Sequence, residues 1–299
     1  MSSVFIPVRG TYFSVDKRRR ALYNIYNYRH TEEEAFTVGQ VIFVTAFKGG
    51  VGKTFVSASV AGALTALGKK VLAIDGDFGM RSLDMLLGCD SSALFDASDV
   101  ISGVCRVGDA LIRAECPGRP DFMPAPQIYD GAEIDRGRTS ELLAYLKSVY
   151  DFVIIDSSAE YSGYYSALAG CADRALIVTS HSSASVRAAG KAAATLAASG
   201  LTDQRLVINM YRRDMAKKGA FPTAEEIISA SSVRLIGIIP YDVHAAADGE
   251  RGRIAFSGEG SRIRPYEAAA VNIAYRLCGN EVPLFKGVFR TMRKKAYLT

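Results

Sequence analysis

Residues 46–55, AFKGGVGKTF, place three glycines and two lysines between a run of apolar residues and a long helical pattern. The preceding run, residues 40–46 (QVIFVTA), is apolar and β-branched, as is typical of a buried strand. The following residues, 54–67 (TFVSASVAGALTAL), have a helical pattern that ends before Gly68. A strand, a glycine-rich loop and a helix in this order predict a turn whose backbone N–H groups can approach an anion closely.

The second half of this loop has the residues of a phosphate-binding site. Gly49, Gly50 and Gly52 carry no Cβ, so a phosphate group can lie directly against their backbone. We expect Lys53 to contact the β- and γ-phosphates of a nucleotide and the Thr54 hydroxyl to bind a magnesium ion. The alternative is an ordinary glycine-rich turn; the flanking strand and helix favour the phosphate site.

From residue 40 onward the chain alternates short apolar runs with helical patterns, which predicts an α/β fold. Such spacing is typical of a doubly wound, mostly parallel sheet with helices on both faces. We therefore expect a P-loop domain over 39–283, preceded by an extension of uncertain order (1–38) and followed by a tail (284–299). The strand-like runs are 41–46, 70–77, 152–156, 174–180, 205–210 and 234–240, and helical candidates include 139–150, 183–198 and 223–231.

Composition excludes some classes of protein but leaves nucleic-acid binding open. Positive and negative charges are nearly balanced, with a net charge of +5, so the net charge does not indicate whether the protein binds nucleic acid. No apolar run approaches the ~18 residues of a spanning helix, and the N-terminus lacks the order of a secretory signal. The five cysteines are far apart and show no CxxC spacing, so we expect reduced, mostly buried thiols in the cytoplasm.

Carboxylates follow two of the predicted strands. Asp75 ends the run VLAID and is followed by Asp77, and Asp156 ends the run FVIID. In a parallel sheet the carboxyl ends of the strands share one edge, where ligands bind. An aspartate after a run of apolar residues is the Walker B arrangement, which directs a carboxylate at the magnesium shell. The alternative role for each aspartate alone is a helix N-cap or a turn.

The lysine at the start of the loop, Lys48, is absent from the general phosphate-loop pattern. With it, KGGVGKT resembles the signature of the deviant Walker A ATPases, the MinD/ParA family. The resemblance implies that Lys48 crosses a dimer interface to the phosphates of the partner's nucleotide, so that two ATP molecules lie between two subunits. It extends over about 41–284, and the segments after the loop favour the MinD branch over its relatives. These segments are residues 67–88, 172–180 with 185–191, 207–242 and 272–284.

The resemblance also implies roles for individual residues, with ATP and Mg²⁺ as cofactors. Asp77 would position the attacking water, and Asp75 and Asp156 would orient the waters of the magnesium ion bound by Thr54. Asn209 would read the adenine edge and Pro240 would flank the base. Lys48 and Lys53 would neutralise phosphate charge in a slow, partner-stimulated hydrolysis. The segment that would contact the nucleotide is Lys48, Gly49, Gly50, Val51, Gly52, Lys53, Thr54 and Phe55.

The sequence departs from the family pattern at three places. After Asp156 the family has a Pro and an Ala-Gly pair, whereas this chain has Ser157, Ser158, Ala159 and Glu160. Phe55 stands where a second Thr is common. The segment 181–191 lacks a Pro-Glu pair and an acidic residue that are usual in the family. Partners that contact these side chains can therefore differ from those of other family members.

The tail, FKGVFRTMRKKAYLT, has the pattern of a basic amphipathic helix. Apolar residues recur at helical spacing on one face, and basic residues surround the other, which favours attachment to the inner face of a membrane. The alternative is a terminal helix docked on the protein body. The apolar set is Phe285, Val288, Phe289 and Met292, and the basic set is Lys286, Arg290, Arg293, Lys294 and Lys295.

The functions left open are a MinD-like ATPase in the spatial regulation of cell division and a ParA-like ATPase that binds DNA. The second would use a basic surface such as Arg212, Arg213, Lys217 and Lys218. A metal-cluster carrier would need paired cysteines, and a scaffold without turnover would not need Asp77. MinC-like and MinE-like proteins are the implied partners, and the basic run 17–20 is either a further contact or simply solvated.

Overall fold

The computed structural model describes residues 4–8, 11–15, 38–77, 82–89, 93–114, 118–126, 135–159, 162–254, 263–286 and 288. Its centre is a seven-stranded parallel sheet with the order β5-β4-β6-β3-β7-β8-β9. A separate antiparallel pair, β1 and β2, falls within the predicted extension. The strands are β1 (Val4–Val8), β2 (Thr11–Val15), β3 (Gln40–Thr45), β4 (Val71–Gly76), β5 (Asp121–Met123), β6 (Phe152–Ser157), β7 (Arg174–Thr179), β8 (Gln204–Tyr211) and β9 (Leu235–Pro240).

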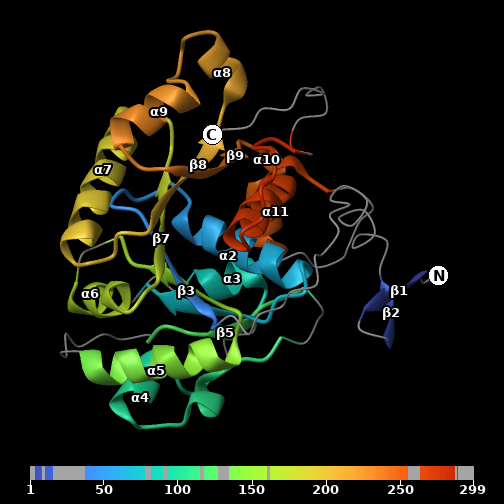
Figure 1. Cartoon of the computed structure of the whole chain (residues 1–299), viewed down its shortest axis with the longest axis vertical. Coiled ribbons are helices and arrows are strands. Elements are labelled where there is room, and N and C mark those ends of the chain that lie inside the picture. Colours follow the sequence, from blue (N-terminus) through green and yellow to red (C-terminus); the bar gives the residue numbers. More distant parts are fainter. Residues whose placement is uncertain are drawn as a thin grey trace.

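Helices cover both faces of the sheet, as the alternation of patterns predicts (Figure 1). The residues of α2, α3 and α11 pack in one apolar cluster, and those of α4, α5, α6, α7 and α9 pack in the other. The helices are α2 (Lys53–Ala66), α3 (Leu83–Leu87), α4 (Ala97–Ser102), α5 (Arg136–Val149), α6 (Gly163–Gly170), α7 (Ser183–Ala198), α8 (Arg213–Lys217), α9 (Ala224–Ser231), α10 (Val243–Glu250) and α11 (Pro265–Leu277), with a 3₁₀ turn η1 (Val107–Ala110).

The central strand β3 shows why the runs in this sequence are continuously apolar. Val41 and Phe43 pack in one cluster, whereas Ile42 and Val44 pack in the other, and all four side chains are fully buried. Side chains alternate between the two faces of a strand, and here both faces are covered. The predicted fold class is therefore confirmed.

The register of the sheet brings distant carboxylates together. Asp75 of β4 pairs with Asp156 of β6, and Val44 of β3 pairs with Asp156 on the other side. Because the three strands are parallel, their carboxyl ends form one edge, at which the glycine-rich loop leaves β3. This edge holds the predicted phosphate and magnesium residues.

Details outside the central pattern differ from the expectations. Four cysteines, Cys89, Cys105, Cys171 and Cys278, are free thiols but only half-buried, and Cys116 lies outside the described residues. Strand β5 has three residues, too few to give a recognisable pattern. In the part of the chain that the structure describes, the helices lack the length and apolar composition needed to cross a bilayer.

Strand β9 packs so closely on α11 that only glycine fits at its centre. A Cβ on Gly237 would lie 2.3 Å from Cγ1 and 2.8 Å from Cδ1 of Ile273, whose side chain is fully buried. We predict that Gly237→Ala lowers the free energy of unfolding by about 1–3 kcal/mol, the usual cost of overpacking. Gly170→Ala is the matched control, because nothing lies within 4 Å of its Cβ position. Urea unfolding that shows equal stability for both variants would contradict this packing.

Candidate nucleotide-binding site

The glycine-rich loop joins β3 to α2 and leaves the first turn of that helix open. Gly50 and Gly52 have φ values of 76° and 80°, a region that other residues rarely adopt. Gly52 is the N-cap of α2, and no side chain caps the helix. The first N–H groups of a helix lack intrahelical partners and carry partial positive charge. An open helix N-terminus behind exposed glycines is therefore suited to bind phosphate.

The residues of the loop divide into exposed and packed positions. Lys48, Gly49 and Gly50 are exposed, and a Cβ on either glycine would meet no atom within 4 Å. Val51 is buried, and the Phe55 ring packs 5.4 Å from the Tyr266 ring of α11. The side chain of Phe55 therefore braces α2 against α11, and only its backbone is left for the predicted nucleotide contact.

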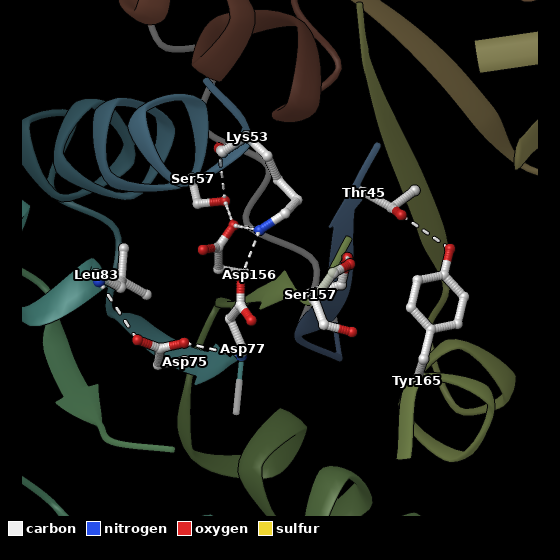
Figure 2. Close-up of polar contacts among 10 residues, drawn as sticks. Thr45, Lys53, Ser57, Asp75, Asp77, Leu83, Asp156, Ser157 and Tyr165 are labelled. Atoms are coloured by element: carbon white, nitrogen blue, oxygen red, sulfur yellow. Dashed lines mark hydrogen bonds and ion pairs between the residues drawn. The ribbon is translucent and has the colours of Figure 1, made fainter. Parts of the chain in front are cut away.

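Lys53 lies among carboxylates at the edge of the sheet (Figure 2). Its ammonium Nζ is 3.3 Å from Asp156 Oδ1 and 3.7 Å from Asp77 Oδ2. Ser57, one turn further along α2, donates a hydrogen bond of 2.7 Å to the same Asp156 oxygen. Lys53 and Asp156 are 8% and 0% exposed, respectively. The lysine predicted to bind phosphate is thus paired with Asp156, predicted for the magnesium site, and with Asp77, predicted to position water.

Asp75 is almost fully buried beside this pair. Its two oxygens accept hydrogen bonds from the backbone N–H groups of Asp77 at 2.9 Å and Leu83 at 3.3 Å. Burial raises the pKa of Asp75 to about 7, and the negative charge of Asp156 adds to this effect, while the two N–H groups oppose it. A pKa near 7 means that this buried carboxyl group is easily protonated, and a cation bound nearby would favour its charged form.

The residues present fit a magnesium ion. Among the described residues, Asp156 Oδ2 is buried without a hydrogen-bond partner, although buried carboxylate oxygens are nearly always bonded. Oxygen atoms of carboxylates, hydroxyl groups and waters are the ligands of Mg²⁺. Thr54, half-buried in the first turn of α2, would supply the hydroxyl group, and Asp75 and Asp156 would supply acceptors for metal-bound water. When bound, the ion would neutralise charge on the phosphates.

Asn209 ties the end of β8 to the loop. Its Nδ2 donates a hydrogen bond of 2.9 Å to the backbone oxygen of Val51, and a Cβ on Gly52 would lie 2.4 Å from the same nitrogen. The strand pairing is irregular between Ile208 and Tyr211, and Met210 has a φ of 54°. This bulge re-aims the strand end, and it is the kind of local strain that collects at functional sites.

A cavity of about 390 Å³ opens next to the bulge, at the ends of β8 and β9. Pro240, which the resemblance implies would flank the base, forms part of its wall. The guanidinium carbon of Arg212 lies 5.1 Å from the centre of the Tyr241 ring. Its lining is Tyr211, Arg212, Arg213, Asp214, Lys217, Pro240 and Tyr241. Aromatic rings and a flat guanidinium are surfaces on which a base can stack.

The structure thus brings together Lys53, Asp75, Asp77 and Asp156, and it places Asn209 against the loop. Lys48 stays apart from them, exposed and without a partner in the described part of the chain. Ser57 and the aromatic walls of the cavity were not identified from the sequence. For Ser57, the available signal was its spacing of four residues from Lys53, which places both residues on one face of the helix.

Two segments are only partly described: the tail, and residues 157–160, which depart from the family pattern and which we call the second switch. Ser157 is buried and its hydroxyl donates to the Ser158 carbonyl oxygen at 2.9 Å, whereas Glu160 lies outside the described residues. Val288 is 4% exposed and packs in the core cluster of α2 and α11, and the Arg213 guanidinium lies 6.0 Å from the centre of the Phe285 ring. Asn272 Nδ2 donates to the Lys286 carbonyl oxygen at 2.9 Å.

The start of the tail is therefore docked on the body, in turns that include 284–286 and 288. This arrangement differs from the exposed helical face expected for Phe285, Lys286 and Val288, because the apolar clusters of the body bury Val288 and partly bury Phe285. The other predicted membrane residues, Phe289, Arg290, Met292, Arg293, Lys294 and Lys295, lie outside the described residues.

Comparisons with known proteins agree with this geometry. Residues 42–255 match the family described as the CobQ/CobB/MinD/ParA nucleotide binding domain. The septum site-determining protein MinD of Bacillus subtilis (strain 168) is 34% identical over 256 residues, which cover 83% of this chain and 92% of that protein.

Two solved structures share the fold over nearly their whole length. MinD in the MinC:MinD cell division protein complex of Aquifex aeolicus has a TM-score of 0.74 and 31% identity, covering 82% of this chain and 98% of that chain. MinD complexed with Mg-ADP from Pyrococcus horikoshii OT3 has a TM-score of 0.69 and 25% identity, and the match covers 80% of this chain and 96% of that chain. This chain belongs to the MinD/ParA family of P-loop ATPases and, within it, groups with the septum site-determining MinD proteins.

Proposed function

We propose that this chain is an ATPase that dimerises on ATP, attaches to the inner face of the cell membrane and acts in the spatial regulation of cell division. The observation that carries the proposal is the separation of the two loop lysines. Lys53 is enclosed by its own subunit's carboxylates, whereas Lys48 is exposed with no partner among the described residues. Lys48 is thus the one of the two that is available to a nucleotide held by another subunit.

Binding of a nucleotide exchanges the partners of Lys53. In the described arrangement the ammonium group neutralises Asp156 and lies close to Asp77. Phosphate oxygens at the N-terminus of α2 compete for the same ammonium group, because charge-assisted hydrogen bonds to phosphate are strong. With Lys53 bound to phosphate, Asp156 and Asp75 would orient water in the magnesium shell and Asp77 would hold the attacking water. Hydrolysis then depends on placement of water and on neutralisation of the γ-phosphate.

Assembly of the dimer supplies the remaining positive charge. A triphosphate beside three carboxylates has more negative charge than one lysine and one divalent ion can balance, so Lys48 from the partner subunit stabilises the charge that develops in the transition state. This requirement makes turnover conditional on two bound ATP molecules. The result is a slow ATPase. A MinE-like partner can raise its rate of hydrolysis, and a MinC-like partner can bind the surface of its dimer.

The tail converts dimerisation into membrane attachment. Each basic residue near an anionic leaflet contributes about 1 kcal/mol, and a single short helix must also be ordered as it binds. One tail therefore binds weakly. Two tails in one dimer make the second insertion intramolecular, which raises avidity by ~10²-fold or more. Insertion of Phe285 and Val288 would also require their release from the body, where both now pack.

A ParA-like DNA-binding function is the second candidate, and the basic residues near α8 are the feature that would support it. Arg212 and Arg213, however, lie over the rings of Tyr241 and Phe285, and both line the cavity at the ends of β8 and β9. Their placement favours a role at the nucleotide base over one on a DNA backbone.

The roles of the two lysines can be separated by substitution. We predict that Lys53→Ala weakens binding of Mg-ADP by about 10- to 100-fold, because a charged hydrogen bond is worth about 1.5–3 kcal/mol. Lys48→Ala should leave Mg-ADP affinity unchanged but lower ATP turnover by about 100-fold or more, as expected for a group that contacts only the partner's phosphate. Lys191→Ala, an exposed residue of α7, is the control. Full turnover by Lys48→Ala would refute the role of this lysine.

The approach of the loop to Asn209 gives a second test. Gly52→Ala should abolish Mg-ADP binding, because its Cβ would lie 2.4 Å from Asn209 Nδ2 at a φ of 80°. Gly219→Ala is matched in backbone conformation, with a φ of 71°, and meets no atom within 4 Å. The control should lose only about 1 kcal/mol of stability from the backbone strain and keep its affinity. Calorimetric titration showing Mg-ADP binding by Gly52→Ala would contradict the proposed loop geometry.

Membrane attachment should follow the nucleotide. In sedimentation with vesicles that contain anionic lipid, we expect the protein to pellet with ATP and to stay largely in solution with ADP. Replacement of both Phe289 and Met292 by Ser should abolish pelleting and leave ATP-dependent dimerisation unchanged. Equal pelleting in both nucleotides would exclude the coupling. ATP-dependent and salt-sensitive binding to DNA without lipid binding would favour the ParA-like function.

A further inference from the structure

Tyr165 connects the helix that follows the second switch with the strand that leads into the loop. It lies in the first turn of α6, where Ser162 Oγ caps the helix by accepting a hydrogen bond of 3.1 Å from its backbone N–H. Its side chain is 1% exposed, and its hydroxyl group is hydrogen-bonded at 2.8 Å to the hydroxyl of Thr45, the last residue of β3 (Figure 2). Either oxygen can be the donor.

The ring of Tyr165 also packs on the side of β3 to which Thr45 projects. It lies edge-to-face on Phe43, with centroids 4.9 Å apart and planes at 84°, and it contacts the Phe47 ring at 5.8 Å. Residues 43, 45 and 47 alternate in the chain and therefore project to one side of an extended backbone. One buried tyrosine thus contacts every second residue of the chain from the middle of β3 to two residues beyond its end.

Lys48 follows Phe47 directly, and it is exposed and unpaired among the described residues. We propose that Tyr165 is a positioning residue for Lys48: its hydroxyl group and ring fix the path on which the chain leaves β3, and they couple that path to the second switch. The inference rests on the proposed function, which assigns Lys48 to the partner's nucleotide. A movement of α6 after Asp156 would shift Phe47 and, with it, the reach of Lys48.

The other half of the loop is held by different contacts. Val51 is bonded to Asn209, and Lys53 is paired with Asp156 and Asp77. None of these contacts involves Tyr165. Binding of a nucleotide by one subunit should therefore not depend on the tyrosine, whereas assembly and turnover of the dimer should.

The test must separate positioning from stability. Tyr165→Phe alone leaves the buried Thr45 hydroxyl without this partner, which is costly, whereas removal of both partners by groups of similar shape is nearly neutral. The informative variant is therefore the pair Tyr165→Phe with Thr45→Val. Thr45→Ser keeps the hydroxyl group and should behave like the wild type. Tyr164→Phe removes a hydroxyl group from the adjacent tyrosine, which is buried to the same 1%, and serves as the control.

Four quantities are measured on the full-length protein: the thermal unfolding midpoint, Mg-ADP affinity, ATP-dependent dimerisation, and turnover at several protein concentrations. For the double variant we expect an unfolding midpoint and Mg-ADP affinity like those of the wild type. Dimerisation should weaken and kcat should fall by about five- to tenfold, the factor that one lost neutral hydrogen bond gives. Thr45→Ser and Tyr164→Phe should match the wild type in all four.

Wild-type dimerisation and kcat in the double variant would overturn the inference. So would a parallel loss of Mg-ADP affinity, because it would show a general structural role for the tyrosine. Lys48→Ala distinguishes this failure from failure of the proposed function. If Lys48→Ala is defective while the double variant is normal, only the positioning role falls; if Lys48→Ala also dimerises and turns over normally, the proposed function itself fails.

Discussion

The balance of charge around Lys53 is the constraint on which the rest of the site depends. Three parallel strands, β3, β4 and β6, bring one ammonium group and the carboxylates of Asp75, Asp77 and Asp156 to a single edge. Burial and the charge of Asp156 raise the pKa of Asp75, and Asp156 Oδ2 has no hydrogen-bond partner in the described part of the chain. Such an edge is suited to a divalent ion and, through it, to a polyphosphate. In the proposed dimer, Lys48 of the partner subunit would add further positive charge.

Much of the fold could be predicted because the strands are buried on both faces. Continuous apolar runs such as 152–155, followed by Asp156, fix the type of each element and the edge at which its polar end lies. Strand β5 could not be found, since three residues have no periodicity to detect. The contribution of Ser57 depends on a packing contact between α2 and β6, and that contact exists only once the register of the sheet is set.

Other features of the site depend on local departures from regular structure, which propensities do not predict. The bulge at Met210 breaks the β8–β9 ladder and gives a non-glycine residue a positive φ, and it places Asn209 on the loop. The docked positions of Phe285 and Val288 follow from an apolar surface formed by α2 and α11, which the amphipathic pattern of the tail alone cannot distinguish from a lipid surface. Arg213 lies over the Phe285 ring and also lines the cavity at the ends of β8 and β9, so this cavity and the start of the tail adjoin.

The central claim is that two copies share two bound ATP molecules, each through the other's Lys48. Sedimentation of Asp77→Ala in saturating ATP and magnesium tests it most directly, because this variant retains both lysines and cannot hold the attacking water. The account predicts the mass of two subunits with ATP, one subunit with ADP, and one subunit in ATP when Lys48→Ala is added. A single subunit for Asp77→Ala in ATP, or an undiminished dimer after Lys48→Ala is added, would contradict it.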